Sequence, residues 1–236
     1  MDYNLLELVR KTPGAVSMTE LFGLFDTVVN NLQCPMGVAV DLGSNAGKSS
    51  FVGSAALSAI FRTDTFHLVD PVYDLTNEEE WKNTFQKTVD NLPWGYCKEK
   101  NFKKDLLRKL KKVSKLEHVL YGVTSLTYLK ESRNYSYVFI DSDDHQLDLL
   151  HQETRMLLEK VMVGGLIFFH DFMGNYVAPG MTADYMVGTG LYEYVDIDWQ
   201  KAINFVNKYD LEKDNNTWHF KDMANPNFLG CIKRVK

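Results

Sequence analysis

Residues 37–51 read Gly37-Val38-Ala39-Val40-Asp41-Leu42-Gly43-Ser44-Asn45-Ala46-Gly47-Lys48-Ser49-Ser50-Phe51. The stretch begins with a short apolar run, which is typical of a buried parallel strand. Residues 51–60, rich in Ala and Ser, predict a helix. A strand, a glycine turn and a helix in this order form a binding crevice at the carboxyl end of the strand. Glycines in the turn allow a ligand to approach the backbone, and the open amides at the helix start attract carboxylate or phosphate.

The spacing of the two glycines separates three classes of ligand. A phosphate-binding P-loop has four residues between its first glycine and its Gly-Lys pair, whereas three separate Gly43 from Gly47. A dinucleotide site has the pattern G-x-G-x-x-G, which the chain does not match here. Sites for S-adenosylmethionine commonly read acid-x-Gly-x-x-x-Gly, and Asp41, Gly43 and Gly47 match that pattern. A tight turn that binds nothing is the alternative.

A second acid supports a nucleoside ligand. Residues 65–69 predict the next strand, and Asp70-Pro71 follows it directly. An acid at the end of the second strand, about 20 residues past the glycine turn, suits a ribose diol. A carboxylate can accept hydrogen bonds from both hydroxyls. NAD sites use the same feature, so Asp70 indicates an adenosine cofactor without deciding which one. A solvated acid before a turn proline is the alternative.

Length and composition predict one sizeable α/β domain, with 236 residues and 45% hydrophobic content. The net charge of −5 gives no global reason to expect a nucleic-acid partner. Cys34, Cys97 and Cys231 have neither zinc nor redox spacing, which favours a reduced protein. The chain start lacks signal-peptide features, and the apolar run 161–169 is too short to span a bilayer. We therefore expect a cytoplasmic protein with no membrane partner.

The first 35 residues predict a helical segment separate from the sheet, with Ser17 and Glu20 as a capping box for its second helix. For the apolar residues of this segment, 1–35, we expect core packing; the functional alternative is a lid over the cofactor or a homo-oligomer contact. We expect the catalytic domain to span 36–236. Beyond the first two strands, the pattern predicts strands at 118–121, 137–140 and 164–169, helices at 78–91, 102–113, 145–160 and 199–209, and a hairpin of 217–221 with 228–233.

Acids follow the predicted strands or end them: Asp41, Asp70, Asp141 and Asp171. Carboxyl ends of parallel strands share one edge, where ligands bind. The stretch Asp141-Ser142-Asp143-Asp144-His145 and the pair His170-Asp171 together offer oxygen and nitrogen ligands for a divalent cation such as Mg²⁺. Such a cation lowers the pKa of a bound hydroxyl, and a histidine near neutrality, His145, could remove the proton. Helix capping by Asp143 and Asp144, and a hydrogen-bonded His170, are the alternatives.

These motifs resemble class I S-adenosylmethionine-dependent methyltransferases, and most closely the small O-methyltransferases similar to macrocin and rhamnosyl O-methyltransferases and to cephalosporin-hydroxylase-type proteins. The resemblance covers residues from about 37 to about 172. Three motifs carry it: residues 40–49, residues 68–71, and residues 139–141 taken with 164–172, which end in His170-Asp171-Phe172. It implies a Rossmann-like, doubly wound α/β fold with a seven-stranded, mostly parallel sheet whose last strand is antiparallel.

The resemblance also implies roles for single residues. The turn 43–47 would hold the methionine end of the cofactor, Asp70 its ribose, and residues 122–125 its adenine. His145 would be the base, with Asp141 and His170 beside the reaction. Asp143 and Asp144 are the alternative acids to Asp141. The implied cofactor-binding residues are Asp41, Gly43, Ser44, Asn45, Gly47, Ser49, Asp70, Ser125 and Asp141, and the implied metal ligands are Asp141, His170 and Asp171.

The expected reaction is methyl transfer from S-adenosylmethionine to a hydroxyl of a sugar or another small molecule, assisted by Mg²⁺ in metal-dependent members. We expect the acceptor to lie over His145, His170 and the glycine- and aromatic-rich segment 173–194, which would be a lid or an irregular loop. Three alternatives stay open. One is an RNA methyltransferase that uses the basic helix 102–113. The others are an NAD-dependent enzyme and a non-catalytic binding protein with this fold.

Overall fold

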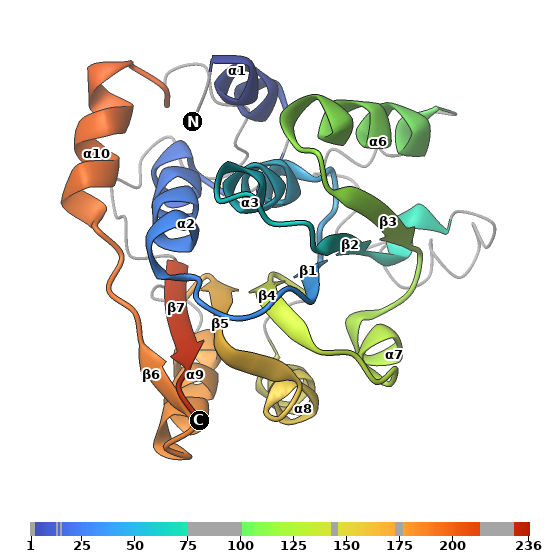
Figure 1. Cartoon of the computed structure of the whole chain (residues 1–236), viewed down its shortest axis with the longest axis vertical. Coiled ribbons are helices and arrows are strands. Elements are labelled where there is room, and N and C mark those ends of the chain that lie inside the picture. Colours follow the sequence, from blue (N-terminus) through green and yellow to red (C-terminus); the bar gives the residue numbers. More distant parts are fainter. Residues whose placement is uncertain are drawn as a thin grey trace.

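The structure is a computed structural model, and it describes residues 3–12, 14, 16–74, 101–142, 146–172, 177–212 and 229–236. A seven-stranded sheet lies between two layers of helices (Figure 1). The strands are β1 (Val38–Leu42), β2 (Thr65–Val69), β3 (Glu117–Tyr121), β4 (Tyr135–Ile140), β5 (Val161–His170), β6 (Tyr192–Tyr194) and β7 (Leu229–Arg234). The helices are α1 (Tyr3–Lys11), α2 (Met18–Asn31), α3 (Lys48–Ala59), the 3₁₀ helix η1 (Pro71–Tyr73), α6 (Phe102–Val113), α7 (Ser125–Leu129), α8 (Leu147–Leu157), α9 (Ala178–Gly188) and α10 (Trp199–Lys208).

The strand order is β3-β2-β1-β4-β5-β7-β6. Strands β1 to β5 run parallel to their neighbours, and β7 is antiparallel to both β5 and β6. The expected doubly wound sheet with an antiparallel last strand is therefore confirmed. The chain builds outward from β1 to β3 and then crosses back to β4 on the other side of β1. Ligands of such sheets bind at this reversal, outside the carboxyl ends of the strands.

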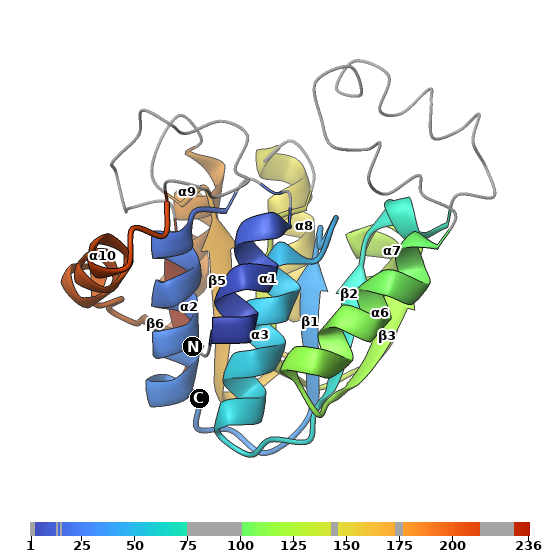
Figure 2. The same cartoon turned by 90° about the horizontal axis from the view of Figure 1, so that it is seen from above.

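The two faces of the sheet are covered by different helices. Helices α1, α2, α3 and α6 lie on one face and α7, α8 and α9 on the other, with α10 outside α2 (Figures 1 and 2). Side chains of a strand alternate between faces: Phe139 and Phe168 lie in the core under α3, whereas Val138 and Ile167 lie in the opposite core. Because both faces are buried, the central strands are continuous apolar runs, as the sequence predicted.

The N-terminal helices are confirmed, and they share the main core. Helix α2 begins with the predicted capping box, in which Ser17 and Glu20 bond reciprocally. Leu5 of α1 and Leu24 of α2 belong to the same buried cluster as Phe51 of α3. Core packing therefore describes these apolar residues. A separate domain boundary at residue 35, and a lid or dimer role for the segment, stay predictions.

Two expectations for the C-terminal third need correction. The segment 173–194 is neither a lid nor an irregular loop where it is described, because residues 178–188 form α9 and 192–194 form β6. Helix α9 packs against α8 and the sheet, so it covers a face. Strand β7 is confirmed, but its partners are β5 and β6; the expected hairpin partner 217–221 and the predicted helix 78–91 lie outside the described residues. None of the described helices has both the length and the hydropathy needed to cross a membrane.

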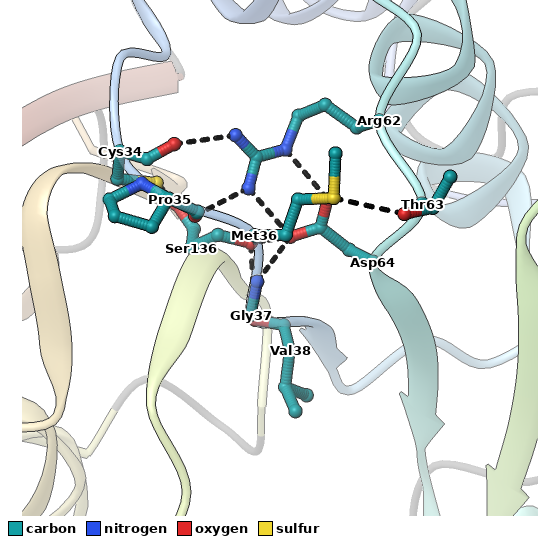
Figure 3. Close-up of polar contacts among 9 residues, drawn as sticks. All are labelled: Cys34, Pro35, Met36, Gly37, Val38, Arg62, Thr63, Asp64 and Ser136. Atoms are coloured by element: carbon teal, nitrogen blue, oxygen red, sulfur yellow. Dashed lines mark hydrogen bonds and ion pairs between the residues drawn. The ribbon is translucent and has the colours of Figure 1, made fainter.

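A buried ion pair joins the chain at the amino ends of β1 and β2 (Figure 3). Arg62 donates to both carboxylate oxygens of Asp64, at 2.6 and 2.8 Å, and to the backbone carbonyl of Cys34. Asp64 also accepts from the backbone amide of Gly37 and from the hydroxyl of Ser136. These contacts fix the entry into β1, and hence the strand that carries the glycine turn.

Candidate functional site

Strand register brings the predicted residues to one edge and one face of the sheet. Leu42 of β1 is level with Ile140 of β4, which is level with Phe169 of β5. One residue further along each strand come Gly43, Asp141 and His170. Side chains at these positions project to the α2–α3 face, because residues two earlier in β4 and β5 belong to that core. Asp141 Oδ1 lies 3.1 Å from His170 Nδ1.

Gly43 is required by this close approach. A Cβ at residue 43 would lie 2.1 Å from the carbonyl oxygen of Asp141. The φ angle of Gly43 is also +82°, which favours glycine. At Gly47, where φ is +85°, a Cβ would lie 2.7 Å from the side chain of Leu106. Both glycines are therefore required by close packing and by the geometry of the turn, whether or not a ligand approaches it.

The turn is held in place by β2 and η1. Asp70 Oδ2 accepts from the backbone amide of Asn45 at 2.9 Å, and Oδ1 accepts from the backbone amide of Val72 at 2.9 Å. The Tyr73 hydroxyl donates to the carbonyl of Asn45 at 2.7 Å and lies 2.9 Å from the Ser44 hydroxyl oxygen. Each Asp70 oxygen keeps a second lone pair for another donor. Asp70 therefore shapes the turn, and it retains acceptor capacity for a ribose.

Asp41 is a fully buried carboxylate below the turn. Its Oδ2 accepts from the hydroxyls of Ser49 and Ser50, at 2.7 and 2.5 Å. Its Oδ1 has no hydrogen-bond partner among the described residues. Burial, to which the charges of Asp141 and Asp70 add, raises the pKa of Asp41 to about 7 against the hydrogen bonds from Ser50 and Ser49. A buried carboxylate oxygen without a donor is costly, so this position suits a positively charged or hydrogen-bonding ligand.

The ionised form of Asp70 is also disfavoured in the folded chain. Burial raises its pKa to about 6, against the hydrogen bonds from Val72 and Asn45, and the charge of Asp141 contributes to the rise. Three carboxylates therefore approach the turn from β1, β2 and β4, and the charge of Asp141 disfavours the ionisation of both Asp41 and Asp70. A cation bound among them would relieve this repulsion.

A second cluster surrounds His170, which is 2% exposed. Its Nδ1 lies 3.1 Å from Asp141 Oδ1 and 3.5 Å from Asp171 Oδ2. Asp171 has a φ of +52°, and this left-handed turn interrupts the alternation of strand side chains, so that residues 170 and 171 reach the same place. Despite burial, the neighbouring carboxylates hold the pKa of His170 well above its usual value.

The donor set Asp141, His170 and Asp171 fits a divalent cation. One ligand atom from each residue lies within 4.8 Å of the others. Adjacent ligands of an octahedral ion with bonds of about 2.1 Å are about 3 Å apart, which is close to the spacing from Nδ1 to the two carboxylates. The predicted metal ligands are therefore brought together, although their role stays a prediction.

Glu20 of α2 is a member of this cluster that sequence reasoning missed. It is 3% exposed, and its Oε1 lies 3.6 Å from His170 Nε2. The motif Ser17-x-x-Glu20 predicted only a helix start. The available signal was position: Glu20 precedes Leu24 by four residues and Thr27 by seven, so it lies on the buried stripe of the helix.

Ser125 is the remaining predicted cofactor residue that the structure describes. It is the first residue of α7 and is buried near the end of β3. Gly122, between them, is in close contact with η1, since a Cβ there would lie 2.4 Å from Asp74 Cβ. His145, Asp143 and Asp144 lie outside the described residues.

Solved structures have the same arrangement of strands and helices. The O-methyltransferase NovP matches with a TM-score of 0.56 at 14% identity, over 92% of this chain and 80% of NovP. CalS11, the calicheamicin methyltransferase, matches with a TM-score of 0.52 at 9% identity, over 92% of this chain and 77% of CalS11. NSun6 from Pyrococcus horikoshii, solved with SFG, matches with a TM-score of 0.52 at 9% identity, over 95% of this chain and 53% of NSun6.

The chain has the Rossmann-like methyltransferase fold. No family model matches its sequence, and no curated protein does. The likeness is therefore one of architecture, and the assignment of chemistry depends on the side chains at the carboxyl edge of the sheet.

Proposed function

We propose that the chain is an S-adenosylmethionine-dependent methyltransferase that acts on a hydroxyl of a small molecule such as a sugar. One observation carries the proposal: Asp141 belongs to both clusters at the carboxyl edge. It faces the glycine turn, where a nucleoside cofactor binds in this fold class, and it contacts His170 in the cation-donor set. A methyl donor and a bound hydroxyl would therefore be neighbours.

The charge of the crevice supports S-adenosylmethionine over NAD. Asp41, Asp70 and Asp141 approach the turn together: the charge of Asp141 raises the pKa of both Asp41 and Asp70, and the charge of Asp70 raises that of Asp41. A sulfonium and an ammonium group would be stabilised there, whereas a pyrophosphate would add like charge. The spacing of Gly43 and Gly47 points the same way.

The proposal gives each of these residues a role. When bound, S-adenosylmethionine supplies a methyl group on a sulfonium, and a divalent cation lowers the pKa of the acceptor hydroxyl. The turn amides and Asp41 would orient the methionine end, and Asp70 would accept from the ribose. Asp141, His170 and Asp171 would hold the cation. His145 would take the hydroxyl proton as the oxygen–methyl bond forms and the sulfur–methyl bond breaks; the chain contributes mainly by positioning.

The acceptor class is supported by the donor set and by the compounds named for the similar folds. NovP is an O-methyltransferase, and CalS11 is a calicheamicin methyltransferase. A second candidate, RNA methylation, is favoured by a single observation: α6 exposes five basic side chains on its outer face, namely Lys103, Lys104, Arg108, Lys111 and Lys112.

Calorimetric titration with S-adenosylhomocysteine tests the proposal. We expect one site per chain, with affinity lowered at least tenfold by Asp70→Asn, because an amide cannot accept from two ribose hydroxyls and two backbone amides. Asp196→Asn, the same chemical change at an exposed position between β6 and α10, is the matched control and should leave the affinity unchanged. Binding of NADH in place of S-adenosylhomocysteine would contradict the proposal.

A further inference from the structure

Glu20 has one carboxylate oxygen whose position the helix cap does not explain. Oε2 accepts from the backbone amide of Ser17 at 2.8 Å and from its hydroxyl at 2.7 Å, which completes the capping box. Oε1 has no hydrogen-bond partner among the described residues and lies 3.6 Å from His170 Nε2. A capping box uses only one carboxylate oxygen of the glutamate as an acceptor. The cap therefore does not explain where Oε1 lies.

The two nitrogens of His170 face different partners. Nδ1 faces Asp141 and Asp171, and Nε2 faces Glu20. A histidine that binds a metal through one nitrogen almost always donates its other N–H to a carboxylate or carbonyl, which fixes the ring and its tautomer. Glu20 Oε1 lies in the place of that outer carboxylate, 3.6 Å from Nε2, which is just beyond hydrogen-bond distance. A small movement of either side chain would therefore orient the ring as a ligand.

We propose that Glu20 is a positioning residue for His170, which accepts the Nε2–H and holds Nδ1 toward a divalent cation shared with Asp141 and Asp171. This rests on the proposed function of the site, and it makes α2 a part of that site. Because one of the three ligands is an imidazole nitrogen, a first-row transition ion such as Mn²⁺ should bind more tightly than Mg²⁺.

Glu20→Gln separates this role from capping. Glutamine also serves in capping boxes, and if its carbonyl oxygen accepts from Ser17, its NH₂ group faces Nε2, where it cannot accept a hydrogen bond. Glu7→Gln is the matched control. It removes the same charge from α1, where Glu7 pairs with Arg10 and Lys11 away from the site.

The test is Mn²⁺ titration of the whole chain without cofactor or acceptor, followed by electron paramagnetic resonance. We expect Glu20→Gln to weaken Mn²⁺ binding 10- to 100-fold and Glu7→Gln to leave it unchanged. In a His170→Ala background, Glu20→Gln should have no further effect, because Glu20 acts through the imidazole. Pulsed measurements on the wild-type complex should show ¹⁴N coupling from a bound imidazole, which His170→Ala abolishes.

Equal Mn²⁺ affinity in wild type and Glu20→Gln would overturn the inference, as would Mn²⁺ bound without ¹⁴N coupling, or no Mn²⁺ binding. The ¹⁴N measurement needs only wild type and His170→Ala, so the inference stays falsifiable if Glu20→Gln does not fold. S-adenosylhomocysteine is titrated into the same samples. If it binds while the Mn²⁺ results are negative, only the role of Glu20 fails; if it does not bind, the proposed function fails.

Discussion

Asp41 is the residue whose burial is hardest to explain in the protein without a ligand. Its carboxylate is completely buried, two serine hydroxyls satisfy one oxygen, and the other has no partner among the described residues. An asparagine or an apolar side chain would fold more easily there. A carboxyl group kept in such a position, with its pKa raised by burial, is typical of a ligand-binding site, and a cationic ligand would favour its ionised form.

The pH dependence of stability follows from the pKa of Asp41, which burial raises from 3.8 to about 7. Between these values the folded chain keeps a proton that the unfolded chain has lost, so this residue lowers the free energy of unfolding as the pH rises through that window. Asp41→Asn removes this loss. We expect the free energy of unfolding of the variant, relative to wild type, to rise between pH 4 and pH 8, by at most about 4 kcal/mol.

Urea denaturation of the cofactor-free protein at several pH values measures this difference. Asp196→Asn, the same chemical change at an exposed position, is the matched control. A flat profile for Asp41→Asn would mean that Asp41 is ionised in the folded chain without penalty, and the argument for a cationic ligand would lose its electrostatic basis.

Single residues of the site could be predicted where a local pattern marks them, and could not where they depend on contacts between distant parts of the chain. Asp70, Asp141 and Asp171 were predictable because acids that follow parallel strands meet at one edge. Glu20 was not, because its contact with His170 spans 150 positions and depends on how α2 packs on β5. The glycine at 43 was predicted for a ligand, but its nearest neighbour is the carbonyl of Asp141, a contact that only the register reveals.

At the element scale, helices and strands with a clear hydrophobic periodicity were predicted correctly, and elements without one were missed. Helix α6 was predicted with its observed bounds, because Phe102, Leu106 and Leu110 mark one apolar face. Strand β6 has only three residues and was missed, since no alternation can develop over that length. Helix α9 was missed because glycines and aromatics in segment 173–194 suggested a loop, whereas its apolar side packs on α8 and the sheet.

The ion pair at the amino ends of β1 and β2 makes a prediction at the same scale. Arg62 and Asp64 are buried, with side chains 9% and 0% exposed. Removing one partner leaves a buried charge unpaired, which costs roughly 3–5 kcal/mol. We therefore expect Asp64→Asn to lower the free energy of unfolding by about 3 kcal/mol and to leave S-adenosylhomocysteine affinity unchanged, because the pair lies at the edge of the sheet opposite the glycine turn.

Glu131→Gln is a fitting comparison, because it breaks the pair that Glu131 forms with Arg133 where the carboxylate is 58% exposed. Exposed pairs contribute at most about 1 kcal/mol. Urea denaturation gives the stabilities, and calorimetric titration gives the affinities. A loss of cofactor affinity in Asp64→Asn, measured where the variant is folded, would mean that the two edges of the sheet are coupled.

At the scale of the whole molecule, the two faces of the sheet hold the apolar core, and the carboxyl ends of its strands hold the candidate site. The strands bury apolar side chains on both faces, so charged side chains can converge only where the strands end. That division made the fold predictable from the sequence. The acceptor was not predictable, because the segments that follow the strands determine which molecule binds, and their arrangement is not encoded in local patterns.

We expect the charge distribution over the whole chain to favour a small-molecule acceptor over RNA. Six basic residues and one acid give α6 a net charge of +5, so the other residues together carry −10. Nucleic-acid binding without sequence preference depends on many lysine or arginine contacts to phosphate, and here one helix supplies them within a negatively charged molecule. We expect single-stranded RNA to bind more weakly than about 10⁻⁴ M at physiological salt. Fluorescence anisotropy with labelled RNA measures this affinity.

Reversing Lys103, Lys104, Lys111 and Lys112 to glutamate should accordingly leave both S-adenosylhomocysteine affinity and methyl transfer to a small acceptor unchanged. These side chains are exposed on the outer face of α6, while its inner face packs on α3 and β3. RNA binding by the wild type that weakens steeply with salt, and that disappears in the reversed variant, would favour the RNA methyltransferase. In that case the cation-donor set would need an acceptor hydroxyl on a ribose, because the chemistry at Asp141 and His170 would remain that of an oxygen nucleophile.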